Sequence, residues 1–411
     1  MIMKLLLVVA YFVPEIGSAA HIYFDLAKAF VRRGHEVHVI TSYPREFNLS
    51  KDDCGRAFLL DEIIEGVSVH RCRHMTLRDN MAVRGMEHFL LPYYYFRAYQ
   101  KLNIKFDACL IYIPPLPLYY FARAIKKFYG TPSVLNYQDF HPQELTDVGL
   151  LKNRLLIKIM EHIERQSYRN ADFITVLSGG GVNYVSSRSG HLSKVEHIYN
   201  GCFIPDSNEH SKRHDFKKIE GIEDKILITY AGILSPFQGL DNILNAAKEM
   251  RGHNDLIFYI VGDGLIKDHL AHRIRNEGIS NVRLLPLQPR DEYFNIINSS
   301  DISLVSLDER MMAPCLPGKL INLTLANQPI VAMVPDNSET AHFIKRSRCG
   351  LVVNPSDAIE LKNAILKLKS DPYSMKKLGD NGRAFACKNM DLKKSVIRYE
   401  NVFQLLSKRG I

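Results

Sequence analysis

Residues 314–322 bring together the groups in this sequence that are best suited to hold a diphosphate. Pro317 and Gly318 stand where a predicted helix begins, and Lys319 follows them directly. Backbone N–H groups at the start of a helix attract anions, and a lysine ammonium adds a full positive charge. Asn322 follows one turn later, and its amide can bond sugar hydroxyls. The segment therefore predicts a diphosphate site, with a solvated lysine and a surface asparagine as the plainer interpretation.

Two turns that follow predicted strands offer glycines for close contact with a phosphate. Gly17 lies in the first turn, between an apolar run and a predicted helix, where a ligand can approach the backbone. Gly232 and Gly239 bracket the second turn, and Ser235 lies between them. Neither turn has the spacing G-x-G-x-x-G, so the dinucleotide-binding pattern is missing. A plain strand-to-helix turn remains the alternative for the first, and the second is a weak pattern by itself.

Carboxylates and histidines elsewhere give a weaker chemical signal. Asp139 follows a predicted strand and is the candidate for a carboxylate near reacting carbons, with a helix cap or a loop salt bridge as the alternative. His70, Cys72 and His74 fall on one face of a predicted strand. Two interleaved arginines and the lack of a fourth ligand argue against zinc there, so we predict no metal site.

Alternating apolar strands and amphipathic helices must hold these turns in place. The chain begins as strand, turn, helix and strand, which favours a parallel sheet, and the alternation starts again near residue 226. We therefore predict an α/β protein of two Rossmann-like, doubly wound domains. Ligands bind outside the carboxyl ends of such strands, so two domains facing a central cleft would share one site. The predicted strands are 4–11, 37–41, 67–71, 108–113, 133–137, 173–177, 195–198, 226–231, 256–261, 282–285, 302–305 and 329–332.

A polar stretch divides the two halves. Residues 200–218 contain Pro205 and suit an interdomain linker. We therefore predict an N-terminal domain over 1–205 and a C-terminal domain over 206–390. The predicted helices include 19–33, 150–169, 239–251, 266–277, 291–299, 318–326 and an amphipathic one over 392–407.

Composition describes an ordinary globular protein with a basic balance. The chain has 411 residues, of which 46% are hydrophobic and 24% charged, so disordered, collagen-like and coiled-coil proteins are excluded. The formal net charge is +9, which indicates an anionic partner without identifying it. Seven cysteines with no C-x-x-C pair fit reduced thiols in a cytosolic protein. The apolar run 108–122 is short and contains three prolines, so we expect no transmembrane helix.

The order of these segments resembles the retaining glycosyltransferases of family 4, which have the GT-B fold. The resemblance covers nearly the whole chain, and it depends on the number and order of motifs because no single one is decisive. An element D-x-x-P places the chain closest to the subgroup acting in bacterial O-antigen, capsule or colanic-acid synthesis. The matching segments are 14–19, 33–37, 139–142, 168–178, 198–201, 230–232, 238–241, 261–264, 281–282, 317–319 and 326–332.

The sequence departs from the family pattern at four positions. The family's Arg and Lys on the donor diphosphate correspond here to Ile233 and Gln238, and its two acidic positions to Pro314 and Asn322. The resemblance then implies that Lys319 carries more of the diphosphate charge and that Asn322 takes the ribose contact. It also implies that the sugar-contacting Glu is absent or displaced, with Asp308 and Glu309 as the replacements to consider.

The resemblance also implies an activity. Such enzymes transfer a sugar, often an aminosugar, from a nucleotide diphosphate to a hydroxyl, with retention of configuration and usually without a metal or cofactor. A front-face attack needs no dedicated base, which agrees with the lack of obvious paired carboxylates. The last helix, over 391–411, would pack back on the first domain. The implied catalytic residues are Asp139 and Lys319, the donor contacts Gly17, Gly232, Ser235, Gln238, Leu287, Pro317, Gly318, Lys319, Leu320 and Asn322, and the acceptor contacts Ser18, His21 and His141.

Residues 66–105 suggest a lipid surface as a second partner. They hold seven cations and two carboxylates, together with the aromatic run 89–96. Basic residues near clustered aromatics suit an anionic membrane, although a surface helix with a buried aromatic side fits the same pattern. We therefore expect a UDP-sugar or a related nucleotide sugar as donor, a lipid-linked saccharide as acceptor and a peripheral location on the cytoplasmic face of the inner membrane. No nucleic-acid recognition motif is present, and we predict no nucleic-acid partner.

Three other activities stay open at this point. A nucleotide-sugar epimerase or hydrolase of the same fold would show an acidic pair and would turn over donor without acceptor. A binding protein with a decayed site would explain the neutral residues at Ile233, Gln238, Pro314 and Asn322. A Rossmann oxidoreductase is disfavoured by the missing dinucleotide pattern.

Overall fold

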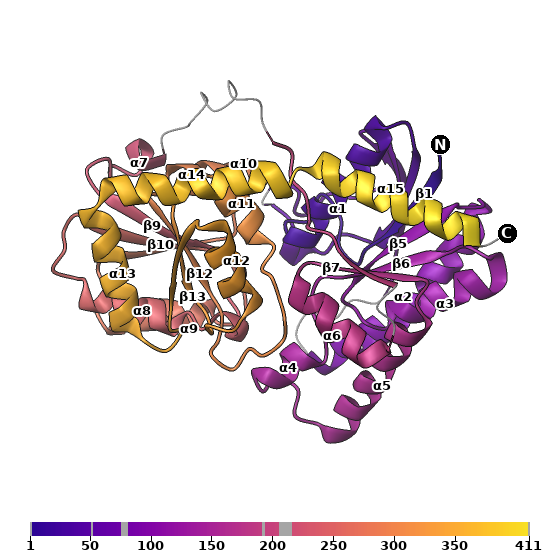
Figure 1. Cartoon of the computed structure of the whole chain (residues 1–411), viewed down its shortest axis with the longest axis horizontal. Coiled ribbons are helices and arrows are strands. Elements are labelled where there is room, and N and C mark those ends of the chain that lie inside the picture. The colour runs from indigo at the N-terminus through magenta and orange to yellow at the C-terminus, as the bar shows by residue number, and fades with distance from the viewer. Residues whose placement is uncertain (1, 51, 75–80, 191–193, 205–215, 410–411) are drawn as a thin grey trace. The chain divides into compact units, whose positions relative to one another are not determined.

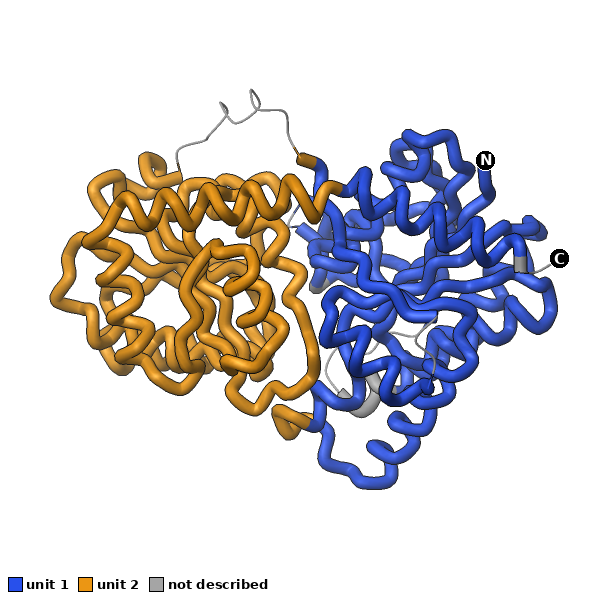
Figure 2. The backbone as a smooth tube through the Cα atoms, viewed as in Figure 1, with its two compact units in different colours: residues 1–146, 151–203, 392–411 blue, residues 147–150, 204–391 orange. Residues whose placement is uncertain are grey.

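Two compact units make up the protein in the computed structural model (Figure 1, Figure 2). The structure describes residues 2–50, 52–74, 81–190, 194–204 and 216–409. Unit 1 comprises residues 1–146, 151–203 and 392–411, and unit 2 comprises 147–150 and 204–391. The sequence predicted residues 147–150 as part of the N-terminal domain, but the structure groups them with unit 2. Pro205, on which the predicted linker depends, lies outside the described residues.

Unit 1 is built on a mostly parallel sheet. In the described residues the sheet has eight strands in the order β3-β4-β2-β1-β5-β6-β7-β8, and only the β3–β4 pair is antiparallel. Its inner strands are continuous apolar runs because helices cover both faces. The strands are β1 Lys4–Val8, β2 Glu36–Ser42, β3 Asp61–Ile64, β4 Val67–Cys72, β5 Ala108–Ile113, β6 Ser133–Tyr137, β7 Phe173–Val176 and β8 Val195–His197.

The helices of unit 1 follow from apolar faces and local caps. Helix α1 buries one side against the sheet, with Tyr23, Leu26 and Phe30 in the core. Helix α6 begins at a Ser178 cap, whose hydroxyl accepts from the N–H of Gly181 at 3.0 Å. The helices are α1 Ser18–Arg32, α2 Met81–Leu102, α3 Leu118–Tyr129, α4 Gln143–Asp147, α5 Arg154–Asn170, α6 Gly179–Ser189 and α15 Leu392–Arg409.

Helix α15 completes the core of unit 1 although it follows unit 2 in the chain. Tyr399 and Phe403 pack beside Phe30 of α1, with ring centroids 6.5 and 5.8 Å away. The Glu400 carboxylate accepts two hydrogen bonds from the guanidinium of Arg33, at 2.5 and 2.8 Å. A Cβ atom on Gly201 would lie 2.4 Å from the Cα of Leu392, so this close crossing requires glycine.

Unit 2 contains an entirely parallel sheet. Within the described residues its strand order is β11-β10-β9-β12-β13-β14, and α8, α9 and α13 share one apolar core with it. Figure 1 shows α10, α11 and α14 on the other side. The elements are β9 Ile226–Ala231, β10 Leu256–Val261, β11 Val282–Leu285, β12 Ile302–Ser306, β13 Ile330–Met333, β14 Gly350–Val353, α7 Phe216–Ile219, α8 Asp241–Glu249, α9 Lys267–Asn276, α10 Arg290–Ser299, α11 Lys319–Leu325, α12 Glu339–Ser347, α13 Ala358–Ser370 and α14 Pro372–Asn389.

The predicted α/β class with parallel sheets is confirmed, and the differences lie at the edges. Strands β3 and β14 were not predicted, because both are short edge strands; β3 also alternates exposed and half-buried residues. Strand β1 ends at Val8 rather than at residue 11, because its pairing with β2 and β5 stops there. The doubly wound arrangement places the loops after the strands at one edge of each sheet.

Candidate functional site

The loop after β9 and the start of α11 meet at the carboxyl edge of the unit 2 sheet. The ammonium of Lys319 lies 3.5 Å from Oε1 of Gln238 and 3.8 Å from the centroid of the Tyr230 ring. A Cβ atom on Gly232 would lie 2.9 Å from the same ammonium, so a larger residue would displace it. The structure thus brings together Gly232, Gln238 and Lys319, three of the residues predicted to contact the donor.

Neutral groups surround the Lys319 ammonium. The Tyr230 hydroxyl lies 3.0 Å from Oε1 of Gln238 and 3.0 Å from the carbonyl oxygen of Ile233, to which it can donate. Burial raises the pKa of Tyr230, so the phenol stays uncharged. The ring face gives a cation–π contact, and the amide oxygen gives a dipole. In the described part of the chain no carboxylate forms an ion pair with Lys319.

Burial lowers the pKa of Lys319 to about 7. The charged form loses hydration there, and no anion replaces it. An anionic ligand at this position would stabilise the ammonium and raise that pKa again. The cluster therefore holds a desolvated ammonium among neutral groups, an arrangement suited to binding an anion.

The backbone at the start of α11 contributes less than predicted. The N–H of Leu320 donates to the carbonyl of Pro317 at 3.0 Å, and the N–H of Ile321 donates to that of Gly318 at 3.4 Å. These bonds tighten the first turn, so two of the N–H groups expected to attract an anion are already directed inward. The attraction for an anion at this edge must come mainly from the Lys319 ammonium.

The remaining predicted donor residues have different surroundings. Asn322 is half-buried and its side chain hydrogen-bonds Tyr293 of α10, whose pKa burial raises to about 12. The Leu320 side chain is fully buried, so only its backbone can face a ligand. Ser235 is buried where the short helix Pro236–Gln238 begins, and Leu287 is half-buried in the loop after β11.

The two acidic residues considered as replacements are occupied within unit 2. The Asp308 carboxylate accepts from Nε and Nη2 of Arg310 at 2.7 and 2.9 Å, and this pairing lowers the pKa of Asp308 against the effect of burial. The Glu309 carboxylate is bonded by the hydroxyl of Ser356. Both carboxylates therefore have partners within unit 2, although each keeps acceptor sites that these contacts do not use.

In unit 1, the loop after β6 carries the candidate carboxylate Asp139. Burial raises the pKa of Asp139 to about 6 and lowers the pKa of His141 to about 4, so the imidazole is neutral at pH 7. Among the described residues no hydrogen bond or ion pair engages the Asp139 carboxylate, so the alternatives of a cap or a salt bridge find no support. Gln138 exchanges two hydrogen bonds with Asn200, at 2.6 and 3.0 Å, which holds this loop to the loop after β8.

The loop after β1 carries the other predicted residues of unit 1. Gly17 precedes α1 with an extended φ of 168° and nothing within 4 Å of a Cβ atom, so this position does not require glycine for its own conformation. Ser18 is exposed at the first turn of α1, and His21 is half-buried one turn later. Ser18 and His21 therefore share one side of α1.

A buried charge network beside this loop was missed by sequence reasoning. Glu15 is 1% exposed, and its Oε1 accepts from the N–H of Arg45 at 3.4 Å and from the amide of Asn48 at 3.1 Å. Desolvation raises the pKa of Glu15 to about 7. Arg45 is paired with Glu87 at 2.5 Å and lies over the Tyr11 ring. In the sequence, Glu15 stands out only as a member of the segment 14–19. No pattern links it to Arg45 or Glu87.

The prediction for residues 66–105 needs a correction at Arg71. Its side chain is fully buried, bonded to Glu62 at 2.7 Å and to the Val13 carbonyl at 2.8 Å, so it cannot belong to a basic surface. Arg78 and the side chain of Arg84 lie outside the described residues. Arg73, Arg97, Lys101 and Lys105 are exposed, as are Phe89 and Tyr93.

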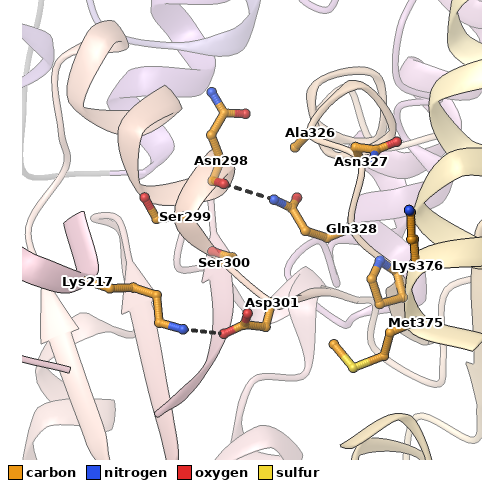
Figure 3. Close-up of a pocket in the computed structure, with 11 residues that line it drawn as sticks. Lys217, Asn298, Ser299, Ser300, Asp301, Ala326, Asn327, Gln328, Met375 and Lys376 are labelled. Carbon is orange, nitrogen blue, oxygen red and sulfur yellow. Dashed lines mark hydrogen bonds and ion pairs between the residues drawn. The ribbon is translucent and has the colours of Figure 1, made fainter. Parts of the chain in front are cut away.

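A polar cavity lies at the opposite edge of the unit 2 sheet (Figure 3). It has a volume of about 440 Å³, and its lining includes Asp301, which precedes β12, and Pro329, which precedes β13. The Asp301 carboxylate accepts from the Lys217 ammonium at 2.9 Å. No residue predicted to contact the donor lines this cavity, so the predicted site and the cavity are separate.

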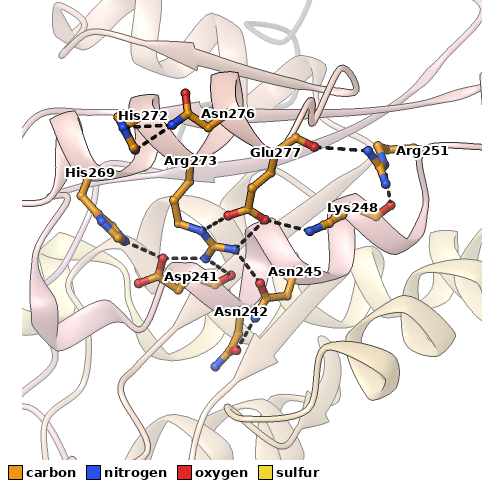
Figure 4. Close-up of polar contacts among 10 residues, drawn as sticks. All are labelled: Asp241, Asn242, Asn245, Lys248, Arg251, His269, His272, Arg273, Asn276 and Glu277. Carbon is orange, nitrogen blue, oxygen red and sulfur yellow. Dashed lines mark hydrogen bonds and ion pairs between the residues drawn. The ribbon is translucent and has the colours of Figure 1, made fainter.

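Asp241, the last residue of the segment 238–241, forms ion pairs within unit 2. Figure 4 shows it between His269 and Arg273 of α9, with its Oδ1 2.8 and 2.7 Å from their nitrogens. Arg273 also contacts Glu277, whose second partner is Lys248 of α8. This network joins α8 to α9.

Sequence comparisons match both halves of the chain. Residues 17–201 match the glycosyl transferase 4-like domain, and residues 211–385 match the glycosyl transferases group 1 domain. WcaI of Escherichia coli K12, a glycosyl transferase whose name refers to colanic acid biosynthesis, is 23% identical over 78% of this chain and 81% of its own length.

Solved structures of similar fold match nearly the whole chain. Sucrose-phosphate synthase from Thermosynechococcus elongatus has a TM-score of 0.76 at 16% identity, covering 98% of this chain and 99% of that one. HepE from Anabaena, solved in complex with UDP, has a TM-score of 0.70 at 17% identity, covering 98% and 100%. At these identities the likeness concerns the fold.

Proposed function

Because this chain belongs to the GT-B glycosyltransferases, we propose that it moves a sugar from a UDP-sugar to a lipid-linked saccharide. The setting would be the synthesis of a surface polysaccharide, with an aminosugar among the sugars to test. The desolvated Lys319 ammonium carries the proposal, because its described neighbours are neutral and a nucleotide diphosphate would supply a compensating anion. The complex of HepE with UDP supports the same class of donor.

The proposed reaction retains the configuration of the transferred sugar. The bond from the anomeric carbon to the diphosphate oxygen breaks, and its electron pair stays on the departing diphosphate. The acceptor hydroxyl oxygen forms the new bond on the same face, and its proton passes to that diphosphate oxygen. Lys319 stabilises the leaving group, and Asp139 stabilises positive charge on the sugar ring. In this scheme the lysine supplies the charge that a divalent metal supplies in other transferases.

A lipid-linked acceptor would bring the protein to a membrane surface. In the part of the chain that the structure describes, no helix is long and apolar enough to cross a bilayer. We propose peripheral attachment on the cytoplasmic face of the inner membrane. The exposed cations Arg97 and Lys101 on α2, with Phe89 and Tyr93 on the same helix, suit an anionic headgroup layer.

Binding of UDP tests the assignment of Lys319. We expect Lys319→Ala to weaken UDP binding about tenfold or more in isothermal calorimetry, because a charge-assisted contact is lost. Lys345→Ala is the matched control, since Lys345 is an exposed unit 2 lysine paired with Asp336. Equal UDP affinity of the two variants would remove Lys319 from the donor site.

Product analysis separates the proposed transferase from its rivals. Proton NMR of the product should show the anomeric configuration of the donor, and activity should survive treatment with EDTA. Turnover of donor in the absence of acceptor would instead support a hydrolase or epimerase. Binding of UDP-sugar without any turnover would support a binding protein, which the neutral residues Ile233 and Gln238 in the donor loop favour as the second candidate.

A further inference from the structure

The polar cavity at the amino edge of the unit 2 sheet offers hydrogen-bonding groups that the fold itself does not use (Figure 3). Its volume of about 440 Å³ is in the range of cavities that hold small molecules. Asn298 and Ser299 line it, and among the described residues no hydrogen bond engages either side chain. Asp301 keeps its Oδ1 free, because the Lys217 ammonium and the N–H of Leu227 both donate to Oδ2. These donors and acceptors together suit the hydroxyl groups of a sugar.

Two amide oxygens in the cavity lining lack a donor. The Gln328 amide nitrogen donates to the Asn298 carbonyl at 3.1 Å, and the Asn327 amide nitrogen donates to Asp380 at 3.2 Å. These bonds fix which atom of each amide is the oxygen. Both oxygens are buried, and none of the described residues donates to them. A buried acceptor without a donor costs free energy, which a ligand hydroxyl that reaches it would recover.

The cavity also carries one uncompensated positive charge. Lys217 is paired with Asp301 at 2.9 Å, whereas Lys376 of α14 is exposed and forms no ion pair with any described residue. Figure 3 shows the Lys217–Asp301 pair and Lys376 on opposite sides of the view. The described lining contains no aromatic ring, which argues against a nucleobase. The lining therefore favours a sugar that bears an anionic group.

Helix α11 connects this cavity to Lys319. The helix begins at Lys319, and Asn327, two residues after its end, lines the cavity. It has seven residues, so about 10 Å separates its two ends. Arg383 of α14 donates to the Leu325 carbonyl at 3.2 Å, and Lys376 of the same helix α14 lines the cavity. A ligand held between α14 and the end of α11 would act on the helix that presents Lys319.

We propose that this cavity binds a sugar bearing a phosphate or a carboxylate, and that its occupancy changes the affinity of the Lys319 site for UDP. The sugar hydroxyls bond the free groups of Asn298, Ser299 and Asp301, and the anionic group meets Lys376. This site goes beyond the proposed function, since no predicted donor residue lines it, and only the coupling rests on that function. Linkage makes the coupling reciprocal, so UDP changes the affinity for the sugar by the same factor.

Calorimetry of the full chain, with and without saturating UDP, tests the site. The probes are glucose 6-phosphate, glucuronate and glucose, which share one ring and differ in charge. We expect at least one anionic sugar to bind, and glucose to bind about tenfold more weakly. Lys376→Glu should weaken binding of the anionic sugar about tenfold or more. Lys377→Glu is the matched control, because Lys377 is the next residue of α14, is exposed and does not line the cavity.

Each outcome decides the proposal. Weaker binding to Lys376→Glu than to Lys377→Glu, with a shift in UDP affinity of about fivefold or more that only Lys376→Glu loses, supports it. Binding of neither anionic sugar, or equal binding to the two variants, overturns the site. Sugar binding that leaves UDP affinity unchanged overturns the coupling. A loss of UDP affinity that persists in Lys376→Glu shows direct competition at Lys319, which also overturns the coupling.

The proposed function is tested separately. The affinity of the sugar-free protein for UDP reports on the Lys319 site alone. Failure of the cavity proposal therefore leaves the proposed function standing.

Discussion

The carboxyl edges of the two sheets surround their desolvated cations in opposite ways. In unit 1, Arg45 is paired with Glu87, and Arg71 is paired with Glu62. In unit 2, Lys319 faces a phenol ring and an amide and has no carboxylate as a partner in the described residues. A desolvated cation with its own carboxylate holds loops together, whereas one without a partner either loses its proton or is stabilised by a bound anion. The comparison assigns positioning to the unit 1 network and anion binding to the unit 2 lysine.

Loss of the Lys319 charge should have the largest effect on activity. We expect Lys319→Ala to lower kcat by about 100-fold to 1,000-fold, because the charge acts on a leaving group that develops in the transition state. Steady-state assays with a saturating sugar donor measure this. An unchanged kcat with a raised KM would limit the lysine to ground-state binding.

Loss of the Arg45 charge should instead affect folding. Arg45→Met leaves the buried Glu87 with only His74, 3.5 Å away, as an ion-pair partner, which we expect to lower the free energy of unfolding by about 3 kcal/mol. Chemical denaturation monitored by circular dichroism measures the change. The double variant Arg45→Met/Glu87→Leu should recover most of the stability, and no recovery would show that the pair is not the cause.

The pH dependence of UDP binding tests whether Lys319, unlike the paired arginines of unit 1, depends on a bound anion for its charge. Burial lowers the pKa of Lys319 to about 7 in the free protein, and a bound diphosphate would raise it, so binding takes up a proton above that pH. Affinity for UDP should therefore fall up to tenfold per pH unit as the pH rises from about 7 to 9. Calorimetry of Lys319→Arg is the control, since arginine stays charged and should remove most of this dependence.

The smallest effect is expected at the exposed network of Figure 4. Arg273 and Lys248 hold the pKa of Glu277 at about 2, below its ordinary value, so the network stabilises the fold fully above pH 4.5 or so. That contribution is lost as the pH falls through the folded pKa. The melting temperatures of the wild type and Glu277→Gln should differ slightly at about pH 6 and converge near pH 2. A gap that persists in acid would assign the effect to packing.

The sequence predicted the inner strands well, because strands buried on both faces are continuous apolar runs such as 108–113 and 256–261. It did not predict β3, whose exposed residues resemble a loop, or β14, which lies at the edge of its sheet. Loop residues after strands were found because topology alone sends them to one edge of a sheet.

The chemistry of the site was only partly visible in the sequence. Lys319 was identified from its place after Pro317 and Gly318, but its contact with Gln238 depends on how far α11 approaches the loop after β9. Likewise, Glu15 and Glu87 meet around Arg45 from three separate segments. Contacts between residues far apart in the chain depend on tertiary packing, which no local pattern encodes.

The return of the chain to unit 1 has a consequence for synthesis in the cell. Val396, Tyr399 and Phe403 belong to the core of unit 1, yet they leave the ribosome after all of unit 2 has been made. Domains in most proteins fold in the order of their translation. Here residues 204–391 can complete their own core first, while the sheet of unit 1 waits with an apolar face exposed. The part of the unit 1 core that α15 covers therefore stays exposed in the nascent chain until this helix has been made and has docked.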